Sequence, residues 1–370
     1  MDSMTKFNSM LQLEKPKDRR DIPVFPMIIT WAGTAAGVIQ VEFYQDPAKW
    51  LDAMDKVHEI IGTPDVTMSN SPKTTVFMEG LKARIPGREL GDDELFQFVE
   101  TDHFPEIGGY DEIVQMGYMN WYGRYLCSIQ EPPFTSPDQL GAAFGEAIQD
   151  MARAQQHFME KGVVPITGTS NMPVFDMLSM IHSVQPFCID LITEPGKIMD
   201  AVNAGTPEVI GSTLEAAKNI PLKTIGLFPM RCSSTFISPD MFKEYAYPAL
   251  KQMVLAFWNA GYTTVMHCDA NWLPILPVFL DLPKTSVHFE LDGATDIFKA
   301  AEILQGWHSF RGDVPATMLA FGTADDVSEY CEKLIGSFGM NGGFMLGSGC
   351  EVPKNAKVEC VKALMDSVRG

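Results

Sequence analysis

Three short segments carry side chains of the kinds that bind metal ions. His267 and Asp269 stand two positions apart, Glu290 follows later, and Cys350 ends a Gly-Ser-Gly-Cys run. Imidazole, carboxylate and thiolate are ligands that Zn²⁺ accepts, and a zinc ion with one exchangeable position can do catalysis. Taken singly, a His is more often only hydrogen-bonded and a Cys is usually a small buried side chain. The fold therefore decides whether these residues form a site.

The elements that must position these residues alternate between short apolar runs and amphipathic stretches, a pattern typical of βα units. We expect strands at residues 23–29, 65–69, 163–166, 224–229, 263–267, 286–291, 307–311 and 343–346. We expect helices at residues 46–61, 136–161, 207–219, 239–260, 272–280, 296–304, 325–335 and 355–368. The irregular, glycine-containing segment 72–131 is interpreted as an insertion near the barrel mouth, with room for a hairpin. The pattern predicts an α/β fold, a single (β/α)8 TIM barrel, with residues 1–370 as one domain.

The candidate ligands fall at the ends of predicted strands, where a barrel of this kind places its active site. Because side chains alternate along a strand, His267 and Asp269 point the same way and Cys268 points the other way. Cys268 could replace Asp269 as a ligand only if the strand were bulged there. We therefore expect a metal site made by His267, Asp269, Glu290 and Cys350.

Composition excludes several classes of function. A formal net charge of −19 repels phosphate backbones and anionic membranes, so we expect neither nucleic-acid nor membrane binding. The cysteines are irregularly spaced and include no Cys-x-x-Cys pair, which favours a reducing, cytoplasmic location. Residues 22–41 carry no charge over the length of a membrane span, but they contain Pro23, Pro26 and two glycines. We interpret them as a strand, a loop and the start of a helix.

Several of these motifs resemble the uroporphyrinogen decarboxylase superfamily, and its zinc methyltransferase branch in particular. The resemblance rests on the pairs and runs already described and on two further segments. The full set is His267-x-Asp269, Glu290, the Gly-Ser-Gly-Cys350-Glu-Val-Pro run, Ser238-Pro239-x-x-Phe242 and Gly312-Asp313-Val314-Pro315. It extends from Pro23 to the C-terminus, is strongest from Thr224 onward, and is weak through residues 72–131.

The resemblance implies a zinc ion, and a corrinoid (cobalamin) supplied by a partner protein. In the methylcobalamin:coenzyme M branch, a His-x-Cys pair and a distant Cys hold zinc, with a carboxylate able to take the fourth position. His267, Cys350 and Glu290 match three of these, whereas Asp269 stands where that branch has its first Cys. A harder ligand leaves the metal more electrophilic and favours an ether oxygen over a thiol. The expected reaction moves methyl from a methoxylated aromatic substrate to Co(I), with Glu290 and Asp269 as catalytic residues.

Three other functions stay open at this point. They are methyl transfer from a methylcorrinoid to a thiol or folate, decarboxylation of a uroporphyrinogen-type substrate, and non-catalytic corrinoid binding. The decarboxylase family has an Arg-Gln-Ala-Gly-Arg segment after its first strand, whereas residues 29–34 here contain no Arg. A homodimer is also left open.

Candidate substrate-binding residues are Trp31, Arg231, Asn271 and Trp272. Trp121 and Tyr122 are further members of a candidate aromatic wall. For the aromatic residues the alternative is core packing. For Arg231 the alternative to binding a substrate carboxylate is a structural salt bridge.

Overall fold

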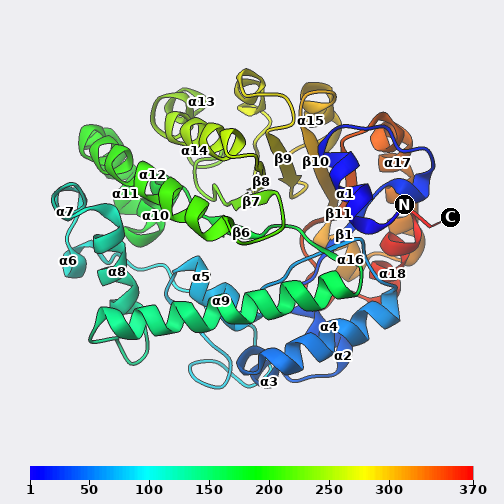
Figure 1. The fold of residues 1–370 in the computed structure, drawn as a ribbon, viewed down its shortest axis with the longest axis horizontal. Helices are drawn as coiled ribbons and strands as arrows, with labels where there is room; N and C mark the ends of the chain where they lie inside the picture. The colour runs from blue at the N-terminus through cyan, green and yellow to red at the C-terminus, as the bar shows by residue number, and fades with distance from the viewer. Residues whose placement is uncertain (370) are drawn as a thin grey trace.

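A curved sheet of parallel strands, with helices around it, forms the core of the computed structural model, which describes residues 1–369 (Figure 1). Seven strands form one sheet, in the order β1 (Val24–Met27), β11 (Phe344–Glu351), β10 (Ser309–Val314), β9 (Val287–Leu291), β8 (Thr263–Cys268), β7 (Thr224–Leu227) and β6 (Thr169–Asn171). A second parallel pair joins β2 (Val66–Thr67) to β5 (Val164–Pro165).

The β2–β5 pair closes the ring between β1 and β6. The Asp65 amide donates to the Val24 carbonyl at 3.2 Å, and the Val164 amide donates to the Asp65 carbonyl at 2.9 Å. β5 and β6 are parts of one chain segment, interrupted only by residues 166–168. Counting them as one strand, the described residues form an eight-stranded barrel, so the predicted TIM-barrel fold is confirmed.

Two apolar layers follow from the alternation of side chains along the strands. Val265 packs with the inner layer, inside the barrel, whereas Met266 packs with the outer layer, between strands and helices. Helix α1 (Ser3–Leu11) adds Phe7 and Met10 to the inner layer. The Ser3 hydroxyl donates to Asp65 at the start of β2, so α1 covers the N-terminal end of the barrel. Sequence analysis did not predict this helix.

Most predicted helices are present, with changed bounds. Those that match expected segments are α4 (Pro47–Ile61), α9 (Pro137–Glu160), α12 (Pro195–Ala217), α13 (Pro239–Met241), α14 (Tyr247–Asn259), α15 (Ile297–Leu304), α17 (Ala324–Phe338) and α18 (Val358–Asp366). A π turn, η2 (Phe242–Ala246), joins α13 to α14. The expectation that a helix begins at Pro207 is wrong, because the Thr206 hydroxyl donates back to the Val202 carbonyl inside α12 instead of capping a new helix. Residues 272–280 form only the 3₁₀ helix η3 (Leu276–Asp281).

The segment 72–131, expected to be irregular, is mostly helical. It holds α5 (Pro72–Glu79), α6 (Phe104–Ile107), α7 (Tyr110–Met116) and α8 (Tyr118–Ile129). It also holds an antiparallel hairpin of β3 (Ala83–Arg84) and β4 (Gln97–Phe98). The positive φ angles of Gly108 and Gly117 end α6 and α7 after about one or two turns, which hid the helical periodicity.

The remaining helices are short. They are η1 (Arg19–Asp21), α2 (Trp31–Ala36), α3 (Gln40–Gln45), α10 (Val174–Ile181), α11 (Val184–Thr193), α16 (Ala316–Phe321) and η4 (Gly339–Asn341). No helix within residues 1–369 is long and apolar enough to cross a membrane.

Asp176 of α10 holds the loop that follows β7. Its side chain is fully buried, and one carboxylate oxygen accepts the amides of Arg231 at 2.7 Å and Cys232 at 3.1 Å. The other oxygen has no hydrogen-bond partner among the described residues. Burial raises the pKa of Asp176 to about 7, although the two amides act in the opposite direction.

Asp176 therefore makes stability depend on pH. Its folded pKa lies above the ordinary value of 3.8, so its contribution is complete below pH 3.8 and is lost as pH rises through about 7. In Asp176→Asn the amide oxygen can still accept both backbone N–H groups without a charge. We predict that the unfolding free energy of Asp176→Asn, relative to wild type, increases between pH 5 and pH 8.

Denaturant unfolding at the two pH values measures this difference. Asp138→Asn, at an exposed position of α9, is the matched control and should show no such trend. A difference that is constant with pH, or that falls, would contradict the assigned role of Asp176.

Candidate metal centre

His267 projects into the barrel from the C-terminal end of β8. Val265, two residues earlier on the same face, lies in the inner layer, and Cys268 lies in the outer layer with Met266. The Cys268 thiol points to the Met266 carbonyl, at 3.5 Å. Alternation along an unbulged strand thus turns the imidazole inward and the neighbouring thiol outward.

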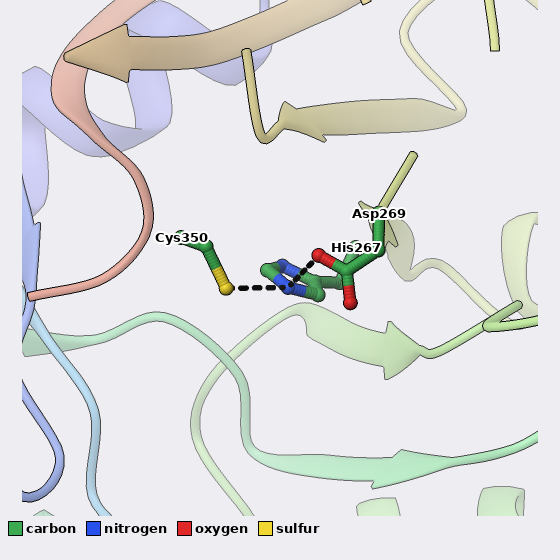
Figure 2. A group of neighbouring side chains, drawn as sticks. All are labelled: His267, Asp269 and Cys350. Atoms are coloured by element: carbon green, nitrogen blue, oxygen red, sulfur yellow. Dashed lines mark hydrogen bonds and ion pairs between the residues drawn. The ribbon is translucent and has the colours of Figure 1, made fainter. Parts of the chain in front are cut away.

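Two potential ligand atoms lie beside one nitrogen of this imidazole, which is itself the third (Figure 2). His267 Nε2 lies 3.3 Å from Asp269 Oδ1 and 3.7 Å from Cys350 Sγ. All three ligand atoms lie within 4.8 Å of one another, close enough to share a metal ion. We call His267, Asp269 and Cys350 the donor group.

Asp269 is positioned by the loop that leaves β8. The next residue, Ala270, has a positive φ of 68°, and its amide donates to Asp292 at 2.7 Å. The Trp272 indole donates to the Asp269 carbonyl at 2.7 Å. These two hydrogen bonds, to Asp292 and from Trp272, hold the backbone at the strand end. The Asp269 carboxylate is thereby directed beside His267.

Cys350 is placed by the close packing of β11. A Cβ atom at Gly347 would lie 2.4 Å from the Phe25 carbonyl oxygen, and one at Gly349 would lie 2.7 Å from the Asp292 carbonyl oxygen. Any side chain at either position would push β11 away from its neighbours. The Ser348 hydroxyl then donates to the Cys350 carbonyl at 2.7 Å. The Gly-Ser-Gly-Cys run thus brings the Cys350 thiol to the donor group.

Glu290 lies on the other side of the His267 ring. Its Oε2 is 3.0 Å from His267 Nδ1, and its Oε1 is 3.0 Å from Arg311 Nε. The latter contact is a charge pair and not an aligned hydrogen bond. The structure therefore differs from the expected ligand set, because Glu290 contacts the nitrogen that faces away from Asp269 and Cys350. Burial opposes ionisation of Glu290, yet Arg311 and His267 lower its pKa to about 2.

The electrostatics of the donor group favour a bound cation. Burial alone would lower the pKa of His267, but its contacts with Asp269, Cys350 and Glu290 raise that pKa well above its ordinary value. Burial would raise the pKa of Asp269, but His267 lowers it. The groups around His267 therefore favour a positive charge at this point. Nitrogen, oxygen and sulfur are ligand atoms that Zn²⁺ accepts, so the donor group fits a zinc ion.

The predicted aromatic substrate residues lie mostly in the packing layer. Trp31 is 1% exposed, and its indole donates to the Ala356 carbonyl at 3.0 Å. Trp272 and Trp121 are fully buried in the outer layer. Tyr122 stacks between two other tyrosines of α8. Of these residues, Trp272 is the one that touches the backbone of the donor group.

The two polar candidates lie on the loops at the mouth. Asn271 is exposed, and its side chain accepts the Leu273 amide at 3.1 Å. The Arg231 guanidinium contacts Glu100 at 3.2 Å and donates to the Ser179 carbonyl at 3.0 Å. Arg231 therefore forms the structural salt bridge that was the alternative to binding substrate.

Sequence analysis missed Glu79, at the end of α5. Its carboxylate is close enough for Asp269 to raise and His267 to lower its pKa, and burial, the largest influence, raises that pKa to about 7. Glu79 belongs to the segment that was expected to be irregular, so no strand or helix pattern marked it. Arg311 was also missed, although it stands directly before the Gly312-Asp313-Val314-Pro315 segment and on the same strand face as Ser309.

Comparison with known proteins identifies the family. Residues 129–370 match the family described as Uroporphyrinogen decarboxylase (URO-D), and the chain belongs to this family. A solved structure, a methyltransferase from Methanosarcina mazei, is similar with a TM-score of 0.64 and 18% sequence identity, over 100% of this chain and 98% of that one. At that identity the likeness shows a shared fold. No curated protein matches the chain significantly in sequence.

Proposed function

We propose that this protein is a zinc-dependent methyltransferase that moves a methyl group from a methoxylated aromatic substrate to the Co(I) of a corrinoid protein. The observation that carries the proposal is the donor group at the strand ends of a URO-D family barrel. It supplies three protein ligands, as catalytic zinc sites do. The similarity in fold to a protein named a methyltransferase is consistent with it.

His267, Asp269 and Cys350 would hold the zinc ion. When bound, zinc supplies Lewis acidity toward an ether oxygen, which makes a phenolate a better leaving group. Glu290 would accept a hydrogen bond from Nδ1 of His267, so that Nε2, once it has given up its proton, would face the metal side. Because Glu290 is held on the Nδ1 side, a zinc ion bound by the donor group would keep a fourth position for substrate.

The surroundings of the donor group suit an aromatic molecule that enters from the mouth. The Phe228 ring lies 5.9 Å from the His267 ring, measured between centroids, and offers an apolar wall. Helix α1 covers the opposite end of the barrel. Substrate and corrinoid protein must therefore approach from the same end, where the methyl group can meet the cobalt.

The charges near the site argue against a uroporphyrinogen-type decarboxylase. A substrate with many carboxylates needs several free cations, but Arg231 is paired with Glu100. Burial acts to raise the pKa of Asp269, but His267 lowers it, so the donor group carries a negative carboxylate. Such a site would repel a polyanion.

One prediction of the proposed function concerns the ligands. His267→Ala and Cys350→Ala should each bind zinc at least about a hundredfold more weakly, since even outer-shell changes cost about ten- to a hundredfold. Methyl transfer should be lost with the zinc. Metal analysis and competition with a chromophoric chelator measure the affinity.

Cys268→Ser is the matched control for Cys350→Ala. Its thiol is fully buried in the outer layer, so the variant should keep its zinc and lose some stability instead. If both His267→Ala and Cys350→Ala kept stoichiometric zinc, the metal would not be bound by the donor group, and the proposal would be wrong.

Another prediction of the proposed function concerns the direction of transfer. Asp269→Cys would make the zinc softer and a weaker Lewis acid toward ether oxygen. Demethylation of a methoxylated aromatic should fall about tenfold or more, equivalent to at least ~1.4 kcal/mol of transition-state stabilisation. Zinc occupancy should stay high, because thiolate is a good zinc ligand.

Rates measured with corrinoid protein kept as Co(I) separate slower chemistry from poor binding. If wild-type protein demethylates no ether but methylates a thiol from methylcobalamin, the proposed role of Asp269 is wrong. Transfer from methylcorrinoid to an acceptor would then be the function.

A further inference from the structure

Arg311 is a fully buried cation in the interior of the barrel. Its side chain leaves β10 on the inner face, and its guanidinium lies over the Phe25 ring at 4.7 Å. Gly347 leaves room for it, since a Cβ there would lie 3.1 Å from Arg311 Cδ. The neighbouring strands are thus shaped to hold this side chain in one place.

Two contacts connect Arg311 to opposite sides of the donor group. Nε pairs with Glu290 Oε1 at 3.0 Å, and the other oxygen of Glu290 contacts His267 Nδ1. Nη1 donates to the Ser348 carbonyl at 2.6 Å, two residues before Cys350. One side chain therefore bridges β9, whose Glu290 contacts His267, and β11, which supplies Cys350.

Stability alone is a poor explanation for this arrangement. Burying an ion pair costs desolvation of both charges, and apolar side chains of similar volume often stabilise a protein as well or better. Arg311 and Glu290 are both almost completely excluded from solvent. The orientation of metal ligands, by contrast, depends on such outer contacts.

We propose that Arg311 is a positioning residue for both arms of the donor group. Through Glu290 it holds the His267 ring with Nε2 toward the other two donors. Through the Ser348 carbonyl it holds the stretch of β11 that carries Cys350. This inference rests on the proposed metal centre and adds a residue that touches neither metal nor substrate.

The test compares the zinc affinity of the full-length wild type with those of Arg311→Met, Arg311→Lys, Glu290→Gln and the double variant Arg311→Met/Glu290→Gln. Arg311→Met should weaken zinc binding by about tenfold to a hundredfold. Arg311→Lys keeps a charge beside Glu290 but cannot present two rigid N–H groups, so it should be intermediate. Lys333→Met is the matched control, because it removes a cation 4.3 Å from the Phe298 ring, away from the donor group.

The double variant separates positioning from general stability. If Arg311 acts through Glu290, the loss in Arg311→Met/Glu290→Gln should be smaller than the product of the two single losses. The double variant also contains no unpaired buried charge, so it can be measured even if Arg311→Met fails to fold. In Co²⁺-substituted protein, the visible spectrum should change in Arg311→Met and not in Lys333→Met.

Two results would overturn the inference. One is zinc affinity in Arg311→Met within about twofold of wild type, far less than outer-shell changes typically cost. The other is losses that multiply fully in the double variant. Zinc affinity is measured without methyl transfer, so a protein that binds zinc but transfers no methyl group refutes the proposed function and leaves this inference standing. A wild-type protein without zinc affinity overturns both.

Discussion

The contact between His267 and Cys350 depends on the curvature of the sheet. The two residues are 83 positions apart in sequence, and β9 and β10 lie between their strands. In a flat sheet, strands three places apart would be separated by about 14 Å. The imidazole and the thiol lie 3.7 Å apart because the sheet closes into a barrel and both side chains point inward. The glycines of β11 then let Cys350 approach closely, and the loop after β8 directs Asp269 toward the same point.

Charge is the second constraint, and it limits what the site can bind. The chain has a formal net charge of −19, and its cations near the site are already paired: Arg231 with Glu100, and Arg311 with Glu290. The donor group adds a carboxylate and a thiol to this acidic surrounding. A metal cation would balance these charges, and the apolar wall at Phe228 favours a substrate that is not a polyanion. Arg311 is the buried counter-charge of Glu290, whose other oxygen contacts His267 Nδ1.

The barrel and the convergence of His267, Asp269 and Cys350 could be predicted from the sequence, because both follow from simple periodic rules. Strand alternation placed His267 inward and Cys268 outward, and the strand-end rule grouped Asp269 and Cys350 with His267. It could not predict which ring nitrogen Glu290 would contact, because that depends on the buried position of Arg311. Nor could it predict α1 or Glu79: α1 is a short helix in a polar N-terminal segment, and Glu79 lies among short helices separated by glycines. Such details arise from tertiary packing that local patterns do not encode.

X-ray absorption at the zinc edge of the zinc-loaded protein tests the central claim most directly, because it counts the sulfur ligands. The account predicts one sulfur at about 2.3 Å, from Cys350, with nitrogen and oxygen ligands at about 2.0–2.2 Å from His267, Asp269 and an exchangeable group. Two or more sulfur ligands, or none, would contradict the account, since the metal would then be held by residues other than the donor group.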